Sequence, residues 1–556
     1  MKKTIAVLWL AITLFGCGDS SKESILEAEN LDYKNELNGD EDGTKQTELP
    51  DSLGFVSVLA NNTSKKMHNL EAVIPPQCYT KTEQKHNPCY TCHQSHTYGT
   101  RPNLMQDAAL QGDYGFSDVG LQNRWDNLFI DRTAEIAAIS DERILEYVAQ
   151  DNYSKLKGRL EAQGWEGYLP DLENLHLAAD AFEADGFAKD GSGWVAFNYK
   201  LLPSTFWPTN GSTDDVFIRL PEKFRTDSAG DYSKTIYQAN LAIVEAAIKE
   251  LDSISVVAFD ENIAGIDLNG DGIQGSVDNI KRPSNYLGAA STVEVVPFLY
   301  PEGVEFLHTV RYVGVKDNGE IYVPQRMKEL RYMRKIRFFT GPKLASLYGN
   351  EKQEKIDENL PKYPDAGDWG LDNKFGWQIS GFIENAEGEL RVQNYEENFF
   401  CMGCHTSIGA TIDQTFAFPR KVTGVKGWGY IDLKGMPDAP AMGETEGEIK
   451  QYFKLVCGGN EFRENDEIHF RFFKNNCDVN DAAVDAATDV YELITPSKER
   501  ALELNKAYRV IVEQQGFIYG RDATVKPVDN VFKEIDSEQE PLEKEHRRSR
   551  DIRLDW

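Results

Sequence analysis

The chain has 556 residues and a formal net charge of −30, with 90 acidic residues against 60 lysines and arginines. Such an acidic balance argues against nucleic acid as a partner and favours basic partners or metal cations. Hydrophobic residues make up 40% of the chain, and length beyond about 300 residues favours more than one domain.

The N-terminus has the composition of an export signal. Lys2 and Lys3 precede an apolar run over 5–15 that is too short to cross a bilayer permanently, and Gly16-Cys17 follows. Leu14-Phe15-Gly16-Cys17 resembles the lipobox of bacterial lipoproteins, which implies a signal peptide over 1–16 and lipidation of Cys17. An ordinary signal peptide is the alternative. We expect a lipid-anchored protein of the cell envelope, on the outer membrane, with the acyl group as its only membrane attachment.

Residues 17–55 are rich in Asp, Glu, Ser, Asn and Gly, so they bury too little apolar surface to fold and predict an acidic tether. The rest predicts an α+β protein with two haem-containing domains, 56–301 and 302–556. Helical spacing marks Thr133–Gln163, Ser233–Leu251, Arg326–Phe339 and Ser497–Gln515. A strand is expected at Ile254–Phe259, and an antiparallel hairpin joins Phe306–Val315 to Ile321–Val323 through Asp317-Asn318-Gly319. Long irregular segments should connect these elements.

Two Cys-x-x-Cys-His motifs carry the chemistry of this chain. Two thiols at this spacing can add to the two vinyl groups of one porphyrin, and the histidine then lies beneath the iron. The alternative is a zinc site that gathers both cysteine pairs, but zinc gives no reason for a histidine after each pair. We therefore expect two covalently bound haems c, with His93 and His405 as proximal iron ligands. The attachment residues are Cys89, Cys92, His93, Cys401, Cys404 and His405.

The second axial ligand decides between a carrier and an enzyme, because two strong ligands leave no room for a substrate. Met436 and Met442 are expected for the second haem, and His68 or His86 for the first; His96, Met67 and Met105 also lie near the first motif. Period-two alternation places His308 with Val310 and Tyr312 on one strand face, so His308 is a further distal candidate, against the alternative of a core histidine.

Three cysteines remain. Cys457 and Cys477 favour a disulfide over two free thiols in an oxidising compartment, which leaves Cys78 either buried and inert or as a thiolate near a haem. The basic run Arg547-Arg548-Ser549-Arg550 with Arg553 is expected to be solvated.

A twelve-residue calcium-loop pattern lies between the two haem motifs. Its oxygen donors are spaced as in the template, Gly272 takes the sharp turn, and an aspartate closes the loop in place of the usual glutamate. The alternative is a turn without metal. The sequence predicts one structural Ca²⁺ held by Asp267, Asn269, Asp271, Ile273 and Asp278.

Three stretches, Pro75–Thr82, Thr205–Val216 and Cys401–Trp428, resemble a family of large two-haem cytochrome lipoproteins of the Gram-negative envelope, over about Val73 to Cys457. The resemblance implies two covalent haems and an exported location, but no substrate. The motifs are 312 positions apart, farther than in compact two-haem peroxidases. We expect electron transfer to redox partner proteins or an external acceptor; the alternative is a two-haem enzyme, of peroxidase or oxygenase type, with one open haem. Whether the chain is an enzyme stays open, since no acid, base or nucleophile set is recognisable.

Overall fold

A computed structural model describes residues 67–95, 106–457, 461, 463–474 and 477–556. Cys17, the signal peptide and the predicted tether lie outside these residues, as do His96 and Met105. The described residues form one compact unit. Within the described part of the chain, no helix has the length and apolarity needed to cross a membrane.

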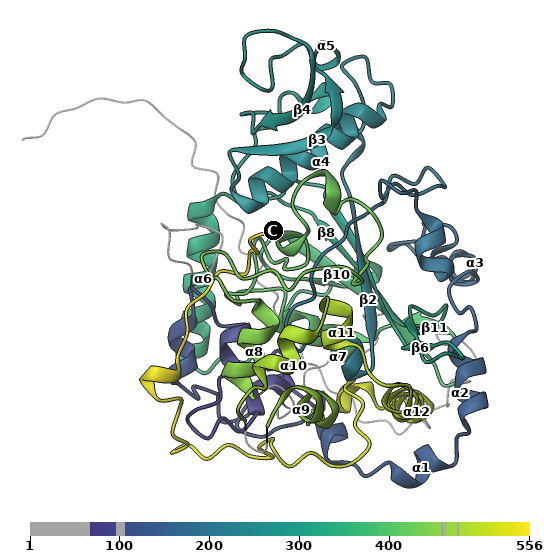
Figure 1. Ribbon diagram of the computed structural model, residues 1–556, viewed down its shortest axis with the longest axis vertical. Coiled ribbons are helices and arrows are strands. Elements are labelled where there is room, and N and C mark those ends of the chain that lie inside the picture. Colours follow the sequence, from purple (N-terminus) through teal and green to yellow (C-terminus); the bar gives the residue numbers. More distant parts are fainter. Residues whose placement is uncertain (1–66, 96–105, 458–460, 462, 475–476) are drawn as a thin grey trace, which may run out of the picture. The chain divides into compact units, whose positions relative to one another are not determined.

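The centre of this unit is an antiparallel sheet of seven strands in the order β1-β2-β5-β8-β10-β11, with β9 paired to β10. Figure 1 shows β2, β8 and β10 in this arrangement. The strands are β1 Val195–Ala196, β2 Thr213–Arg219, β5 Glu305–Arg311, β8 Met327–Lys335, β9 Leu371–Asp372, β10 Trp377–Glu384 and β11 Leu390–Val392. The boundary predicted between 301 and 302 falls just before β5, so both predicted haem domains contribute strands to one sheet.

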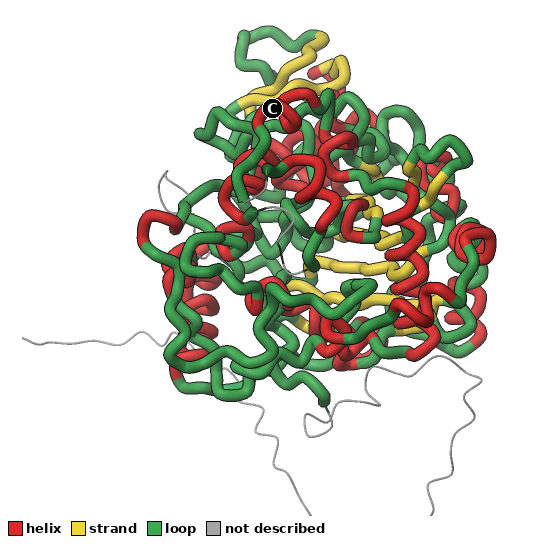
Figure 2. Tube along the Cα trace, turned by 60° about the horizontal axis from the view of Figure 1, so that its bottom comes forward, coloured by secondary structure: helices red, strands yellow, loops and turns green. Residues whose placement is uncertain are grey.

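Helices and loops surround this sheet, which makes the fold the α+β class predicted from the sequence. Long loops separate the elements along much of the trace (Figure 2). The helices are α1 Thr133–Ala137, α2 Asp141–Val148, α3 Leu156–Ala162, α4 Lys234–Lys249, α5 Glu261–Ala264, α6 Gly341–Ile356, α7 Tyr395–Phe399, α8 Glu448–Val456, α9 Asp466–Phe472, α10 Asp481–Ala486, α11 Val490–Ile494 and α12 Lys498–Gln514.

Helices α4 and α12 confirm two of the predicted helices almost to the residue. Each begins after a serine whose Oγ accepts a backbone N–H of the first turn: Ser233 from Ile236 and Ser497 from Arg500. The predicted helix over 133–163 is instead three short helices, because Ser140 caps the start of α2 and ends the preceding turn.

The helix predicted over 326–339 is wrong, because most of this segment is the central strand β8. Met327, Leu330 and Met333 have helical spacing, but β8 is paired on one side with β5 and on the other with β10. A strand in this position is buried on both faces, so apolar and polar residues need not alternate and its periodicity misleads.

The remaining strands form two small hairpins. β3 (Ser253–Asp260), which contains the predicted strand, pairs with β4 (Ser276–Lys281) beside α4. β6 (Gly314–Val315) pairs with β7 (Ile321–Tyr322) around the predicted turn, where Gly319 has φ +84°. The predicted hairpin is therefore shorter than expected: its first strand, β5, pairs with β2 and β8 of the large sheet.

Candidate haem site

The two Cys-x-x-Cys-His motifs fold into turns of the same geometry. In each turn the second cysteine's N–H lies 3.2 Å from the first cysteine's carbonyl oxygen, at Cys92 and Cys404. The N–H of the histidine donates to that same oxygen, at 2.8 Å for His93 and 3.0 Å for His405. Such a turn fixes the spacing of two thiols and an imidazole that attachment and ligation of one haem require.

Both imidazoles are held through their Nδ1 atoms. His93 Nδ1 lies 2.9 Å from Asp107 Oδ2, and His405 Nδ1 lies 2.8 Å from the carbonyl oxygen of Gln414. An acceptor at Nδ1 selects the tautomer that leaves Nε2 free to ligate a metal. Burial lowers the pKa of His405 to about 4, so its imidazole is neutral, as ligation requires.

Asp107 connects the first motif to the second. Its Oδ1 accepts the N–H of Gln94 at 3.0 Å, and its Oδ2 accepts the N–H of Gly409 at 3.1 Å, four residues after the second motif. A second close approach lies at Gly403, where a Cβ would collide with the carbonyl oxygen of Val73. The two motifs, far apart in the sequence, therefore lie side by side.

A large apolar cavity lies between the sheet and the motifs. It contains about 1870 Å³ of space not filled by atoms, counted out to the open solvent, and is lined by Cys92 of the first motif and Cys401, Cys404 and His405 of the second. Apolar side chains form much of the remaining wall, among them Leu201, Leu202, Phe206, Trp207, Val216, Phe306, Met333, Ile379, Phe416 and Phe418. Such a lining suits a flat apolar ring.

The wall formed by the sheet also carries charged side chains. His308 of β5 and Arg331 of β8 are direct cross-strand partners, and both line the cavity. Arg331 binds Glu329 through two hydrogen bonds of 2.9 and 3.0 Å, and His308 Nε2 lies 3.3 Å from Asp214 Oδ2. Burial opposes ionisation of Glu329, but Arg331 and Arg521 hold its pKa to about 2. Burial lowers the pKa of the neighbouring Lys328 to about 7.

The face predicted for His308 is confirmed in part: His308 and Val310 line the cavity, whereas Tyr312 packs against Tyr147 and Tyr508. The charged residues of β8 were missed, because this segment was assigned to a helix. Glu329, Arg331 and Met333 share one face of β8, but this face mixes charged and apolar residues, so no alternation in the sequence indicated the strand.

The other distal candidates lie elsewhere or outside the described residues. His68 Nε2 is 2.9 Å from Asp126 Oδ2, and neither Met436 nor Met442 is among the residues that line the cavity. His86 lies beside Cys457 and Cys477. Of the distal candidates that the structure describes, His308 is the one that the fold brings to the cavity wall.

Among the remaining cysteines, Cys457 and Cys477 are joined by a disulfide with Cα atoms 5.0 Å apart, as the sequence favoured. Cys78 is unpaired. Burial, and then the nearby thiols of Cys89 and Cys404, raise its pKa to about 12, so it is a neutral thiol beside both motifs.

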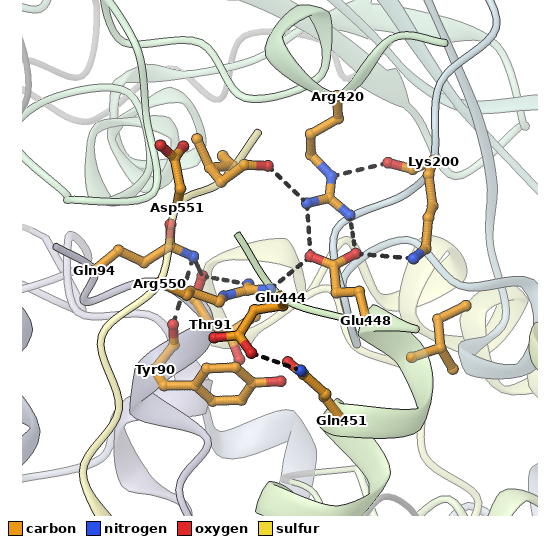
Figure 3. A network of polar contacts seen from close by, with 12 residues as sticks. Tyr90, Thr91, Gln94, Lys200, Arg420, Glu444, Glu448, Gln451, Arg550 and Asp551 are labelled. Atoms are coloured by element: carbon orange, nitrogen blue, oxygen red, sulfur yellow. Dashed lines mark hydrogen bonds and ion pairs between the residues drawn. The ribbon is translucent and has the colours of Figure 1, made fainter. Parts of the chain in front are cut away.

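The C-terminal segment packs against the first motif (Figure 3), so the solvated run expected there is wrong for Arg550 and Arg553, whereas Arg548 and Ser549 are exposed. Arg550 and Arg553 are buried. The Arg550 guanidinium lies 4.7 Å from the ring centroid of Tyr90 and donates to Glu448 Oε1 at 2.5 Å. Glu448 also accepts two hydrogen bonds from Arg420. A tail rich in arginine is buried here because a carboxylate is buried with it.

The predicted calcium loop joins β3 to β4. Asp267 accepts the N–H groups of Gly270 and Gly272 at 2.5 and 2.8 Å, Asn269 accepts that of Asp271, and Asp271 accepts that of Ile273, each at 2.8 Å. Asp278 lies in β4 and is exposed.

Glu261 is a buried glutamate that the sequence did not point to, and its carboxylate fixes the backbone of the loop. It accepts the N–H groups of Leu268, Asn269 and Gly275 at 2.6, 3.0 and 3.0 Å. Among the described residues, the carboxylate oxygens of Asp267, Asp271 and Asp278 do not all lie within 4.8 Å of one another. A calcium site in this loop therefore stays a prediction.

Comparison with known proteins identifies the family. A family model for a group of lipoproteins matches residues 62–492. A protein of Aquifex aeolicus (strain VF5) with the printed name "Uncharacterized lipoprotein" is 33% identical over 533 residues, covering 83% of this chain and 87% of that protein. No solved structure matches the chain. The chain therefore belongs to this family of lipoproteins.

Proposed function

We propose that the protein is a two-haem c-type cytochrome that transfers electrons in the bacterial envelope. The observation that carries the proposal is the pair of identical turns, each with two thiols and an imidazole whose Nδ1 is already hydrogen-bonded, beside one large apolar cavity. Haem would supply a one-electron redox centre at each motif. Cys89 and Cys92 would hold the first with His93 beneath its iron, and Cys401 and Cys404 the second with His405.

The surroundings suit this assignment. Four arginines line the cavity, Arg331, Arg420, Arg463 and Arg521, and arginine binds carboxylates such as haem propionates. Asp107 contacts His93 of the first motif and Gly409, four residues after the second, so the residues that would hold the two haems lie close together. The acidic chain and the lipid anchor predicted at Cys17 agree with an outer-membrane protein that meets basic redox partners or an external acceptor.

Zinc is less well supported than haem at these cysteines. Among the described residues, two groups each bring three potential metal ligands within 4.8 Å of one another. One is His86, Cys457 and Cys477, and the other is Glu543, Glu545 and His546. Neither contains a thiol of the two Cys-x-x-Cys-His motifs. A structural zinc site would need four such ligands around one point.

Haem staining of the denatured protein tests the proposal, because a thioether-bound haem stays with the chain on a gel. We expect two haems per chain and half that content after Cys401→Ala with Cys404→Ala. Cys78→Ser is the matched control, since this thiol lies beside both motifs but in neither, and should keep both haems. A colourless denatured band, or full haem content in the double variant, would overturn the assignment.

A redox enzyme is the second candidate, and the charged sheet wall favours it. His308, Arg331 and Glu329 line the same cavity as His405 and offer an imidazole, a cation and an ionised carboxylate where a small substrate could bind. Carbon monoxide separates the two functions, because it enters only an open or weakly ligated haem. No change in the reduced spectrum with carbon monoxide supports the carrier; binding at one haem, lost or altered in His308→Ala, supports the enzyme.

A further inference from the structure

Outside the haem site, four metal-ligating side chains from separate segments meet at the Cys457–Cys477 disulfide. The ligand atoms of His86, Cys457 and Cys477 all lie within 4.8 Å of one another. His469 of α9 is outside this group, but its Nε2 atom lies 3.6 Å from Cys457 Sγ. Two sulfur donors and one nitrogen donor are therefore gathered, and a second imidazole borders them on the side of Cys457.

We propose that these four residues form a Cys₂His₂ site for Zn²⁺ when the disulfide is reduced. Zinc bonds of about 2.3 Å to sulfur and about 2.0 Å to nitrogen put a tetrahedral S···N edge at about 3.5 Å. The Cys457–His469 separation of 3.6 Å matches that edge. Two thiolates also neutralise the ion, so the loaded site can be buried without an unpaired charge.

The fold holds the ligands in place before any metal binds. Cys457 ends α8 in the left-handed region, with φ +56°, and is fully buried. His469 stacks on Phe473 at a centroid distance of 4.8 Å. The N–H of His86 donates to Thr82 at 2.7 Å, and Asn87 donates to Leu455 of α8 at 2.8 Å. Closing the site requires the two sulfurs to separate after reduction and His469 to approach the other ligands, while the surrounding contacts hold the backbone in place.

Oxidation and metal binding exclude each other in this site. A dithiol reductant attacks the disulfide, is itself oxidised to a disulfide, and leaves both cysteines reduced. One Zn²⁺ then binds both thiolates with release of two protons. Attack is expected at Cys477, which is half-buried, rather than at the fully buried Cys457. The zinc content of the site would depend on the thiol redox state. Because His86 lies three residues before Cys89, bound zinc would restrain the segment that leads into the first haem motif.

The test is to count zinc in the full-length protein before and after reduction. Haem-loaded protein is incubated with Zn²⁺ with and without a dithiol, freed of unbound metal and analysed for zinc per chain; zinc X-ray absorption gives the ligand shell. We expect one additional zinc in the reduced protein with two sulfur and two nitrogen ligands. An equal zinc content in both states, or a shell without two sulfurs, would overturn the proposal without requiring any variant.

Variants assign the ligands. Cys457→Ser with Cys477→Ser should bind no additional zinc, and His469→Ala should weaken binding by about tenfold or more. Cys78→Ser and His176→Ala are the matched controls and should bind zinc as the natural chain does. Retention of the zinc in the double serine variant would refute this site. Haem content measured on the same samples reports on the cytochrome assignment separately.

Discussion

Asp107 is a buried carboxylate that links the first motif to the segment that follows the second. It is 5% exposed, and its two oxygens accept hydrogen bonds from His93 Nδ1, Gln94 and Gly409. A carboxylate at Nδ1 makes the imidazole a more basic ligand, which stabilises ferric over ferrous iron. His405 has a backbone carbonyl in the same role. The two haems would therefore differ in reduction potential. Only the potential of the first would depend on a side chain, because Asp107 contacts His93 Nδ1.

If the two proposed haems are bound, Asp107→Asn should raise the reduction potential of one and leave the other nearly unchanged. The amide keeps one oxygen, which can accept at only one of the two positions that the carboxylate serves, and it loses the negative charge beside His93. A rise of tens of mV is expected, on a scale where about 59 mV is tenfold in a one-electron equilibrium. Redox titration followed by absorbance measures both haems. Asp113→Asn is the control, since Asp113 is exposed; equal potentials in both variants would contradict the prediction.

Among the elements, the β3–β4 loop has an acidic surface held in shape by backbone hydrogen bonds. The buried Glu261 accepts three N–H groups from the loop. The ammonium of Lys281 lies against Gly270, where it competes with a bound cation for the loop carboxylates. Any calcium bound here must displace or outweigh that charge, which argues for a weak site of the extracellular kind.

If calcium binds this loop, chelation should lower the melting temperature without changing the haem spectrum. A site saturated a hundredfold above its Kd stabilises the folded state by about 2.7 kcal/mol. Asp271→Ala should abolish the chelator effect and the bound calcium, measured by calorimetry and metal analysis. Asp252→Ala is the control, because Asp252 is exposed and outside the loop. A natural chain that is indifferent to chelation would reduce the loop to a turn.

The sequence predicted elements well where local chemistry decides them. Helices α4 and α12 were found because periodicity and a serine cap agree, and the β6–β7 turn because Asn318-Gly319 favours it. Strand β8 was missed because burial on both faces removes the alternation that marks a strand. For the site, the thiols and imidazoles were readable from the motifs. Asp107 and Arg331 were not, because sheet register and loop packing, which local patterns do not specify, bring them there.

At the scale of the whole molecule, one buried carboxylate connects distant parts of the chain (Figure 3). Glu448 pairs with Arg420, Arg550 and Lys200, and Arg550 in turn covers Tyr90 of the first motif. Burial alone would raise the pKa of Glu448, but these three cations lower it well below its usual range. Folding therefore favours the ionised carboxylate, and the network fixes the C-terminal segment over the motif.

Glu448→Gln should destabilise the protein by about 3–5 kcal/mol at neutral pH, because it leaves buried cations without their counter-ion. Since the folded pKa of Glu448 lies below its unfolded value near 4.3, this stabilisation is present above about pH 4.3 and is lost as the pH falls towards the folded pKa. The difference between natural and variant chains in denaturant unfolding should therefore shrink in acid. Glu444→Gln, a nearby exposed glutamate, is the matched control and should change stability little. Equal destabilisation in both variants, or a Glu448→Gln effect that is independent of pH, would show that the network does not rest on this charge.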